Sequence, residues 1–135
     1  RVDAGGASLL GAGGADDPFA PGGALLLLKG LLKLADISNV ARPWATARAW
    51  TARVADEMHA QGDAEVRALG EAAPSAPMFD RARFRSLSHS SAGFVDFVAG
   101  ALYEVLAPLS PQTAAMAAAL ARNRALSQEE IDAIA

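Results

Sequence analysis

The side chains able to do chemistry are few in this chain, and they fall into two short segments. Residues 35–39 place a carboxylate, Asp36, and an amide, Asn39, three positions apart, about one helical turn. A serine-rich segment around His89 leads into an aromatic ring at Phe94. The chain has two histidines and no cysteine, so any metal site here must use oxygen and imidazole ligands. Taken alone, Asp36 is more typical of a helix end than of a metal ligand.

Residues 88–91, Ser-His-Ser-Ser, raise the alternative of a hydrolase nucleophile beside its base. Neighbours in sequence rarely present the geometry of nucleophile, base and orienting carboxylate that acyl transfer needs, and no strand-turn-helix elbow carries these serines. We therefore do not assign a nucleophile. We interpret His59 and His89 as surface or supporting residues rather than metal ligands.

Length and charge set the class of protein. A chain of 135 residues with a net charge of -3 has the size of one domain and lacks the basic surface of a nucleic-acid binder. The apolar run of residues 24–34 contains Lys29 and Lys33 and is too short to cross a membrane, which needs about 20 residues. We expect no nucleic-acid partner, no membrane segment and a cytoplasmic location, since the absence of cysteine fits a reducing compartment. The first residue is Arg1 and not methionine, so we expect a fragment.

The remainder of the sequence predicts helices only, because no stretch alternates with the period of two that marks a strand. Residues 1–23, rich in glycine and alanine, are predicted to be a flexible lead-in to one unit of residues 24–135. The helices are expected over residues 24–36, from Pro43 to an interruption at 61–63, over 91–106, from Pro111 to 121, and from a capping box at Ser127 and Glu130 onward.

Two of these helices carry an apolar stripe that we expect to be buried. On the second helix the stripe is Trp44, Ala47, Trp50, Val54 and Met58. On the third helix it is Phe94, Phe97, Val98, Ala101, Leu102 and Val105. The sequence thus predicts an all-α helical bundle.

An ordered set of segments resembles the class I 3',5'-cyclic nucleotide phosphodiesterases. The set comprises residues 35–39, Arg42-Pro43, Trp50, Glu57, residues 61–63 with Glu65, and residues 93–97. The resemblance covers about residues 25–124. It implies the all-α, HD-type fold of that catalytic domain, with this chain as its carboxy-terminal part.

The resemblance also implies a reaction. In the family, two divalent metal ions, zinc with magnesium or manganese, hold a hydroxide that attacks the cyclic phosphate of cyclic AMP or cyclic GMP and yields the 5'-monophosphate. Two cations neutralise the phosphodiester and make hydroxide available near neutral pH. Asp36 stands where the family has a direct zinc ligand. The other ligands lie upstream in the family, so we expect this chain to supply one ligand and to be inactive by itself.

Three further residues match or replace members of the family's nucleotide pocket. Asn39 would line the pocket, and Phe94 matches the aromatic ring that stacks on the purine. Core packing remains an alternative for Phe94, and we assign Phe97 to the core. Ser91 stands where the family has a glutamine that hydrogen-bonds the purine, and a hydroxyl is too short for the paired contact of an amide. We therefore expect weak or altered base discrimination.

A second hypothesis keeps the family and drops the activity. The chain would then be a catalytically inactive helical domain with an interaction or regulatory role, and Ser91 would be a trace of a pocket no longer used. Whether the parent forms a homodimer is left open. A helical bundle unrelated to nucleotides would require the whole ordered set of matches to be coincidence.

Overall fold

The computed structural model describes residues 21–70 and 72–135, and this part of the chain is helical without any strand. Its main helices are α1 (Pro21–Asp36), α2 (Trp44–Leu69), α3 (Leu87–Phe94), α4 (Gly100–Leu106) and α5 (Pro111–Asp132). The short turns are η1 (Ser38–Ala41), η2 (Pro77–Phe79), η3 (Arg81–Arg83), the π-helical η4 (Val95–Ala99) and η5 (Ala107–Leu109). The all-α prediction is confirmed. Residues 1–20 of the predicted lead-in lie outside the described part, and α1 begins at Pro21, within its last three residues.

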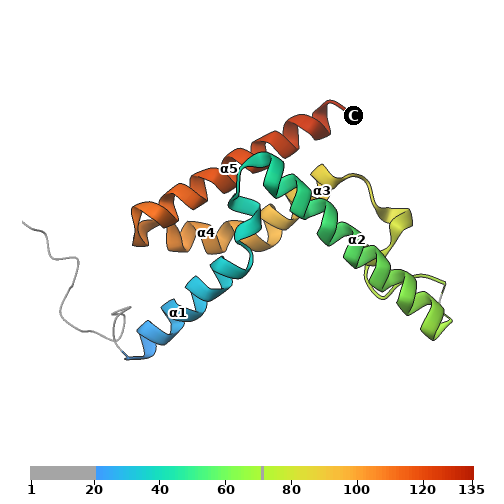
Figure 1. Ribbon diagram of the computed structural model, residues 1–135, viewed down its shortest axis with the longest axis horizontal. Helices are drawn as coiled ribbons and strands as arrows, with labels where there is room; N and C mark the ends of the chain where they lie inside the picture. Colours follow the sequence, from blue (N-terminus) through green and yellow to red (C-terminus); the bar gives the residue numbers. More distant parts are fainter. Residues whose placement is uncertain (1–20, 71) are drawn as a thin grey trace, which may run out of the picture.

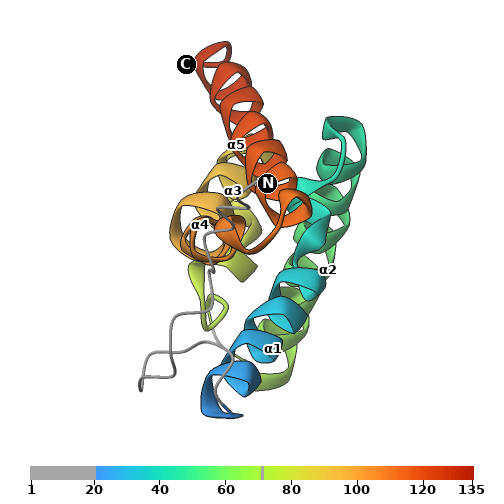
Figure 2. The same cartoon turned by 90° about the vertical axis from the view of Figure 1, so that its left-hand side faces the viewer.

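The continuous helical run from α3 to η5 lies in the middle of the molecule, where α5, α2 and α1 all contact it. Figure 1 shows α1 and α2 diverging from η1, with α5 crossing above the run. In the perpendicular view of Figure 2, α1 and α2 lie together to the right of α3 and α4. Helix α5 lies above α3 and α4 and runs to the C-terminus. The turn at η1 therefore contacts α5, a helix from the second half of the sequence.

One hydrophobic cluster holds these helices together. Its buried members are Leu34, Val40, Val95, Ala99, Tyr103, Leu106 and Leu120, which come from α1, η1, η4, α4 and α5. Tyr103 is the largest of them and only 1% exposed, and its hydroxyl donates to the carbonyl of Ile37 at 3.5 Å. Tyr103 thus joins the core to the end of α1.

The predicted stripe on the central run is only partly right, because Phe94 and Leu102 pack against the hydrophobic cluster whereas its other members are exposed. Phe97 is 91% exposed, and Val98 and Val105 are exposed too, whereas the core members Val95 and Tyr103 point inward. The cause is that residues 94–106 are apolar apart from Asp96, Gly100, Tyr103 and Glu104, so hydrophobic periodicity could not select the buried face. The assignment of Phe97 to the core is therefore incorrect for the described part of this chain.

The same run bears on the prediction of no membrane segment. Residues Leu87–Leu109 form 23 helical residues with a mean hydropathy of 1.5, which is long and apolar enough to cross a membrane. A single run of this kind is weak evidence, because the core helix of a soluble protein meets the same criterion. One face of this run does form the centre of the hydrophobic cluster.

The buried face of α2 also differs from the predicted stripe. The buried residues of α2 are Ala47, Ala55, His59 and Gly62, whereas Trp50 is 45% exposed with the Arg53 guanidinium 5.4 Å from its ring centroid. Small side chains let a neighbouring element come close to the helix, which large ones prevent. Packing, and not hydrophobicity, therefore decides which face of α2 is covered.

The sequence predicted that α2 is interrupted at residues 61–63, and this is wrong. The helix continues through Gly62 to Leu69 and ends at Gly70 with φ 67°. A Cβ placed at Gly62 would lie 2.2 Å from the carbonyl oxygen of Phe79 in η2. The glycine is needed for this close approach of two backbones. The segment 61–63 thus has a packing role.

Helix α5 is also continuous, so the predicted capping box at Ser127 is wrong. Ser127 is fully buried in the middle of α5, while the reciprocal capping box forms at the start of the helix, between Ser110 and Thr113. In that box the Thr113 amide donates to the Ser110 hydroxyl at 3.1 Å, and the Ser110 amide donates to the Thr113 hydroxyl at 3.0 Å. Similarly, Ser86 caps α3, which begins four residues before the predicted start.

Candidate functional site

The first candidate segment is the turn from α1 into α2. Asp36 is the last residue of α1 and is exposed, and Asn39 lies half-buried in η1. The Ile37 amide donates to the Lys33 carbonyl at 3.2 Å, which completes the last turn of α1. The Arg42 amide donates to the Asn39 carbonyl at 3.3 Å, which closes η1. The chain therefore presents a carboxylate and an amide on a short, hydrogen-bonded turn.

A residue that the sequence did not single out holds this turn from behind. The side-chain amide of Asn123, on α5, donates to the carbonyls of Val40 and Arg42, both at 2.8 Å. Asn123 is 6% exposed. The one sequence signal is an asparagine inside an alanine-rich helix, and it does not indicate the partners, which lie 83 and 81 residues away.

The second candidate segment is α3, which carries Ser91 and Phe94. Both side chains are half-buried. Phe94 packs against the hydrophobic cluster, so the packing role that the sequence left open for it is real. Gly93 precedes it, and a Cβ placed on Gly93 would have no atom of the described residues within 4 Å. The Phe94 side chain therefore packs on the core and remains partly exposed.

The fold brings the two segments onto the same hydrophobic cluster. Ile37, just before η1, and Ala41, its last residue, pack against it, and so does Phe94. Val40 of η1 and Val95, next to Phe94, are buried members of that cluster. Residues that are far apart in the sequence are thus fixed relative to one another by common core packing.

Charged groups fasten α5 to the elements on either side. The Arg124 guanidinium makes a bidentate contact with Asp96 of η4, both bonds at 2.8 Å, and this holds the pKa of Asp96 below its usual value. Glu130 accepts hydrogen bonds from the Ser88 hydroxyl and the Arg48 guanidinium, and these two, in that order, lower its pKa. Helix α5 therefore connects α2, α3 and η4.

The comparison with known families decides the identity of the chain. Residues 20–120 match the family described as 3'5'-cyclic nucleotide phosphodiesterase. The chain belongs to this family. The resemblance seen in residues 25–124 is thereby confirmed, and the helical architecture of this phosphodiesterase chain agrees with it.

Individual relatives give the same result. The chain is 31% identical over 99 residues to the 3',5'-cyclic-nucleotide phosphodiesterase regA of Dictyostelium discoideum, and 36% identical over 106 residues to mouse 3',5'-cyclic-AMP phosphodiesterase 4C. It is 34% identical over 82 residues to the dual 3',5'-cyclic-AMP and -GMP phosphodiesterase beta of Plasmodium falciparum. These alignments cover 73%, 78% and 61% of this chain, but only 12%, 15% and 7% of the relatives.

A solved structure has the same fold. The structure of LmjPDEB1 in complex with IBMX superimposes with a TM-score of 0.74 at 31% sequence identity. The match covers 84% of this phosphodiesterase chain and 33% of the solved chain. The described helices therefore correspond to about one third of that structure.

The metal-binding capacity of this phosphodiesterase chain is limited. Within residues 21–70 and 72–135, no three histidine, aspartate or glutamate side chains converge to hold a metal ion. The exposed carboxylate of Asp36 suits one bond to a divalent cation, which prefers charged oxygen ligands. The described residues thus fit a contribution of one ligand and not a whole site.

Neither histidine joins Asp36. His59 is 6% exposed and makes an edge-on contact with Phe84, with ring centroids 4.9 Å apart, so of the two roles expected for it, surface or supporting residue, the surface one is wrong. The tertiary contact with the loop before α3 buries it. His89 is half-buried, and its Nδ1 lies 2.8 Å from the hydroxyl of Ser86.

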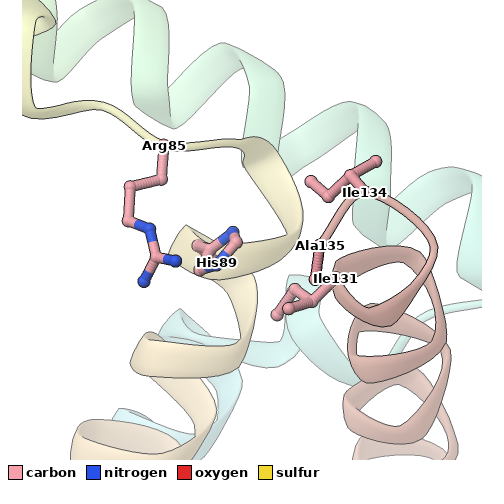
Figure 3. A pocket seen from close by; sticks show the side chains of 5 residues that line it. All are labelled: Arg85, His89, Ile131, Ile134 and Ala135. Atoms are coloured by element: carbon pink, nitrogen blue, oxygen red, sulfur yellow. The ribbon is translucent and has the colours of Figure 1, made fainter.

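Two cavities in the described part of this phosphodiesterase chain lie away from the four candidate residues. One of about 230 Å³ is lined by Arg85, His89, Ile131, Ile134 and Ala135. Figure 3 shows Arg85 and His89 facing the three side chains at the end of α5. A second, of about 320 Å³, is lined by residues that include Arg48, Ser88 and Glu130. Asp36, Asn39, Ser91 and Phe94 line neither of these two cavities.

Proposed function

We propose that this chain is the carboxy-terminal part of the catalytic domain of a longer phosphodiesterase that hydrolyses cyclic AMP, cyclic GMP or both to the 5'-monophosphate. The observation that carries the proposal is the placement of Asp36, Asn39 and Phe94 on segments that share one hydrophobic cluster. Such common packing keeps a metal ligand and a nucleotide-binding surface in a fixed relation. The relatives' names include a cyclic AMP enzyme and a dual cyclic AMP and cyclic GMP enzyme, which supports the substrate class.

Each candidate residue has a defined task in this proposal. Two divalent metal ions, zinc with magnesium or manganese, would supply positive charge for the phosphodiester and a water of lowered pKa. The Asp36 carboxylate would bind one of these ions, and most other ligands would come from outside this chain. The Asn39 amide would hydrogen-bond the nucleotide, and the Phe94 ring would stack on the purine.

Ser91 sets the expected selectivity. An amide can donate to and accept from a purine edge at the same time, whereas a serine hydroxyl is shorter and makes one such contact. We therefore expect this protein to bind the base with less discrimination than a protein with glutamine at this position.

The exposed apolar side chains support a surface shared with the rest of the domain. Leu26 and Leu32 of α1 are 72% and 66% exposed, and Phe97 and Val105 on the central run are exposed as well. Large apolar side chains exposed on α1 and on the central run, which contact each other, suit a surface that another part of the protein covers. In the proposal this surface packs against the other part of the catalytic domain.

The test uses the longer protein and one substitution. Its hydrolysis of cyclic AMP and cyclic GMP would be measured together with its zinc content, with and without Asp36→Asn. We expect Asp36→Asn to lower hydrolysis at least about 100-fold and to reduce zinc content, because the amide is neutral and binds the cation weakly. The control is Asp56→Asn, which changes an exposed carboxylate on α2 and is expected to leave both unchanged.

Two results would contradict the proposal. If the longer protein hydrolysed neither nucleotide, the second hypothesis of an inactive interaction or regulatory domain would replace it. If Asp36→Asn retained full zinc content and activity, the metal-ligand role of Asp36 would be withdrawn. The isolated chain, with one candidate ligand, is expected to be inactive.

A further inference from the structure

Asn123 makes contacts that the proposed reaction does not yet use. Its amide nitrogen donates two hydrogen bonds to the end of η1, to the carbonyls of Val40 and Arg42, each at 2.8 Å. The side chain is 6% exposed, so water does not substitute for these contacts easily. Both amide protons of this buried asparagine are therefore used in hydrogen bonds that attach α5 to the end of η1.

The turn needs such a donor because of the residue that follows it. The carbonyls at the end of a helical turn lack partners within the turn. Arg42 is extended, with φ -76° and ψ 167°, as the residue before a proline prefers, and Pro43 has no amide proton to give. The chain therefore leaves η1 with carbonyls that require an external donor, and α5 supplies it.

The held carbonyls lie next to a candidate nucleotide contact. The Arg42 amide donates to the Asn39 carbonyl at 3.3 Å, so Asn39 is part of the same closed turn. If the carbonyls of Val40 and Arg42 were released, the turn that orients Asn39 would lose its hydrogen bonds to α5 and keep only the core packing of Val40 and its neighbours. Asp36 would be less affected, since it lies in α1 and precedes the turn.

The next residue of α5 holds the other side of the candidate site. Arg124 makes its bidentate contact with Asp96, two residues after Phe94. Consecutive residues of α5 thus fasten both segments that carry the candidate nucleotide contacts, Asn39 and Phe94. The arrangement gives α5 a role beyond that of a packing helix.

We infer that Asn123 is a positioning residue that holds η1 so that Asn39 can bind the nucleotide. This inference rests on the proposed phosphodiesterase function. Asn123 does not touch substrate in it and acts only through the turn. Its loss should therefore weaken nucleotide binding more than it slows the chemical step.

The test is Asn123→Asp in the longer protein, with KM and kcat for cyclic AMP measured separately. Aspartate has the same shape, but near neutral pH it has no proton to donate and would face two carbonyl oxygens. We expect KM to rise about tenfold while kcat and zinc content change less than threefold. A second variant, Asn123→Ala, removes both donors without adding charge and should raise KM by a smaller factor, which keeps the test available if the aspartate variant folds poorly.

The matched control is Thr113→Val. Thr113 is also a buried polar residue of α5, 8% exposed, but the acceptors near its hydroxyl lie just before the helix, with the Ala107 carbonyl oxygen at 3.2 Å and the Ser110 carbonyl oxygen at 2.9 Å. It should lower the thermal unfolding temperature, as the Asn123 variants do, and leave KM unchanged. If KM is compared between Thr113→Val and an Asn123 variant with the same loss of stability, an effect of positioning is distinguished from general destabilisation.

The outcomes distinguish this inference from the function on which it rests. Unchanged KM in both Asn123 variants, with normal hydrolysis by the unmodified protein, would overturn the positioning role alone. An equal rise of KM in Thr113→Val would overturn it too, because the effect would then follow stability. Failure of the unmodified protein to bind or hydrolyse cyclic nucleotide would overturn the proposed function and this inference together.

Discussion

Replacing Gly62 by alanine would put a methyl group into the backbone of the loop that packs on α2. The added Cβ would lie 2.2 Å from the Phe79 carbonyl oxygen and 2.9 Å from the Phe79 carbonyl carbon. The loop is fixed at both ends of this contact, since Asp63 pairs with Arg81 at 3.0 Å and Glu65 accepts from the Ser75 amide at 3.1 Å. It would have to move by about 1 Å to restore ordinary van der Waals separation.

The magnitude follows from two opposing effects. Overpacking of this kind costs about 1–3 kcal/mol, and we expect the upper end because the clash is with backbone and not with a flexible side chain. Alanine inside a helix recovers about 1 kcal/mol relative to glycine. The expected net loss for Gly62→Ala is about 2 kcal/mol in the free energy of unfolding, or roughly 8 °C in Tm.

The control is Gly30→Ala, a glycine in the interior of α1. Its Cβ would lie 3.6 Å and 3.7 Å from the two methyl carbons of Leu106, which is ordinary contact. We expect it to stabilise the protein by about 0.5–1 kcal/mol. Thermal and urea unfolding of both variants would be compared with the unmodified protein. A rise in Tm for Gly62→Ala similar to that of Gly30→Ala would refute the close packing of η2 on α2.

Three further predictions concern single side chains. Ser91→Gln should lower KM for cyclic AMP or cyclic GMP in the longer protein, and unchanged values for both would contradict a base-contacting role. Ser127→Ala should raise the free energy of unfolding by about 1 kcal/mol, because the Ser127 hydroxyl is buried without a partner among the described residues; a loss of stability in urea unfolding would show that the hydroxyl is satisfied. The lowered pKa of Asp96 means that its ion pair with Arg124 stabilises the fold above about pH 4 and is lost as the pH falls through the folded-state pKa. Stability measured from pH 6 to pH 3 should therefore fall more for the unmodified protein than for Asp96→Asn, by no more than about 1 kcal/mol since the pair is partly exposed; parallel curves would contradict this.

The central run shows why helix positions were easier to predict than buried faces. Its apolar content and the absence of strand patterns suffice for a helix, since backbone hydrogen bonds of a helix are local. The buried face depends on which elements pack against the helix. In a run where most side chains are apolar, the residue types of Phe97 and Tyr103 do not show which of the two is buried. The structure buries Tyr103 because α1 and α5 contact that side.

The predicted capping box at Ser127 and the predicted interruption at Gly62 failed for a related reason. Ser127 and Glu130 have the spacing of a capping box, yet the same serine fits inside a continuous helix when its surroundings bury it. Gly62 has the usual meaning of an interruption, but here it serves a close contact with Phe79. Local sequence signals carry no information about partners that arrive from 17 or more residues away.

The sequence by itself determined the helical class, the family and the positions of Asp36, Asn39, Ser91 and Phe94 within its pattern, because these depend on residue types in a fixed order. Only the tertiary structure decided that Asn123 and Tyr103 hold the turn after Asp36, and that one hydrophobic cluster carries both candidate segments. The physical reason is that such contacts join residues more than 60 positions apart, and their energy comes from burial and hydrogen bonds that no local pattern records.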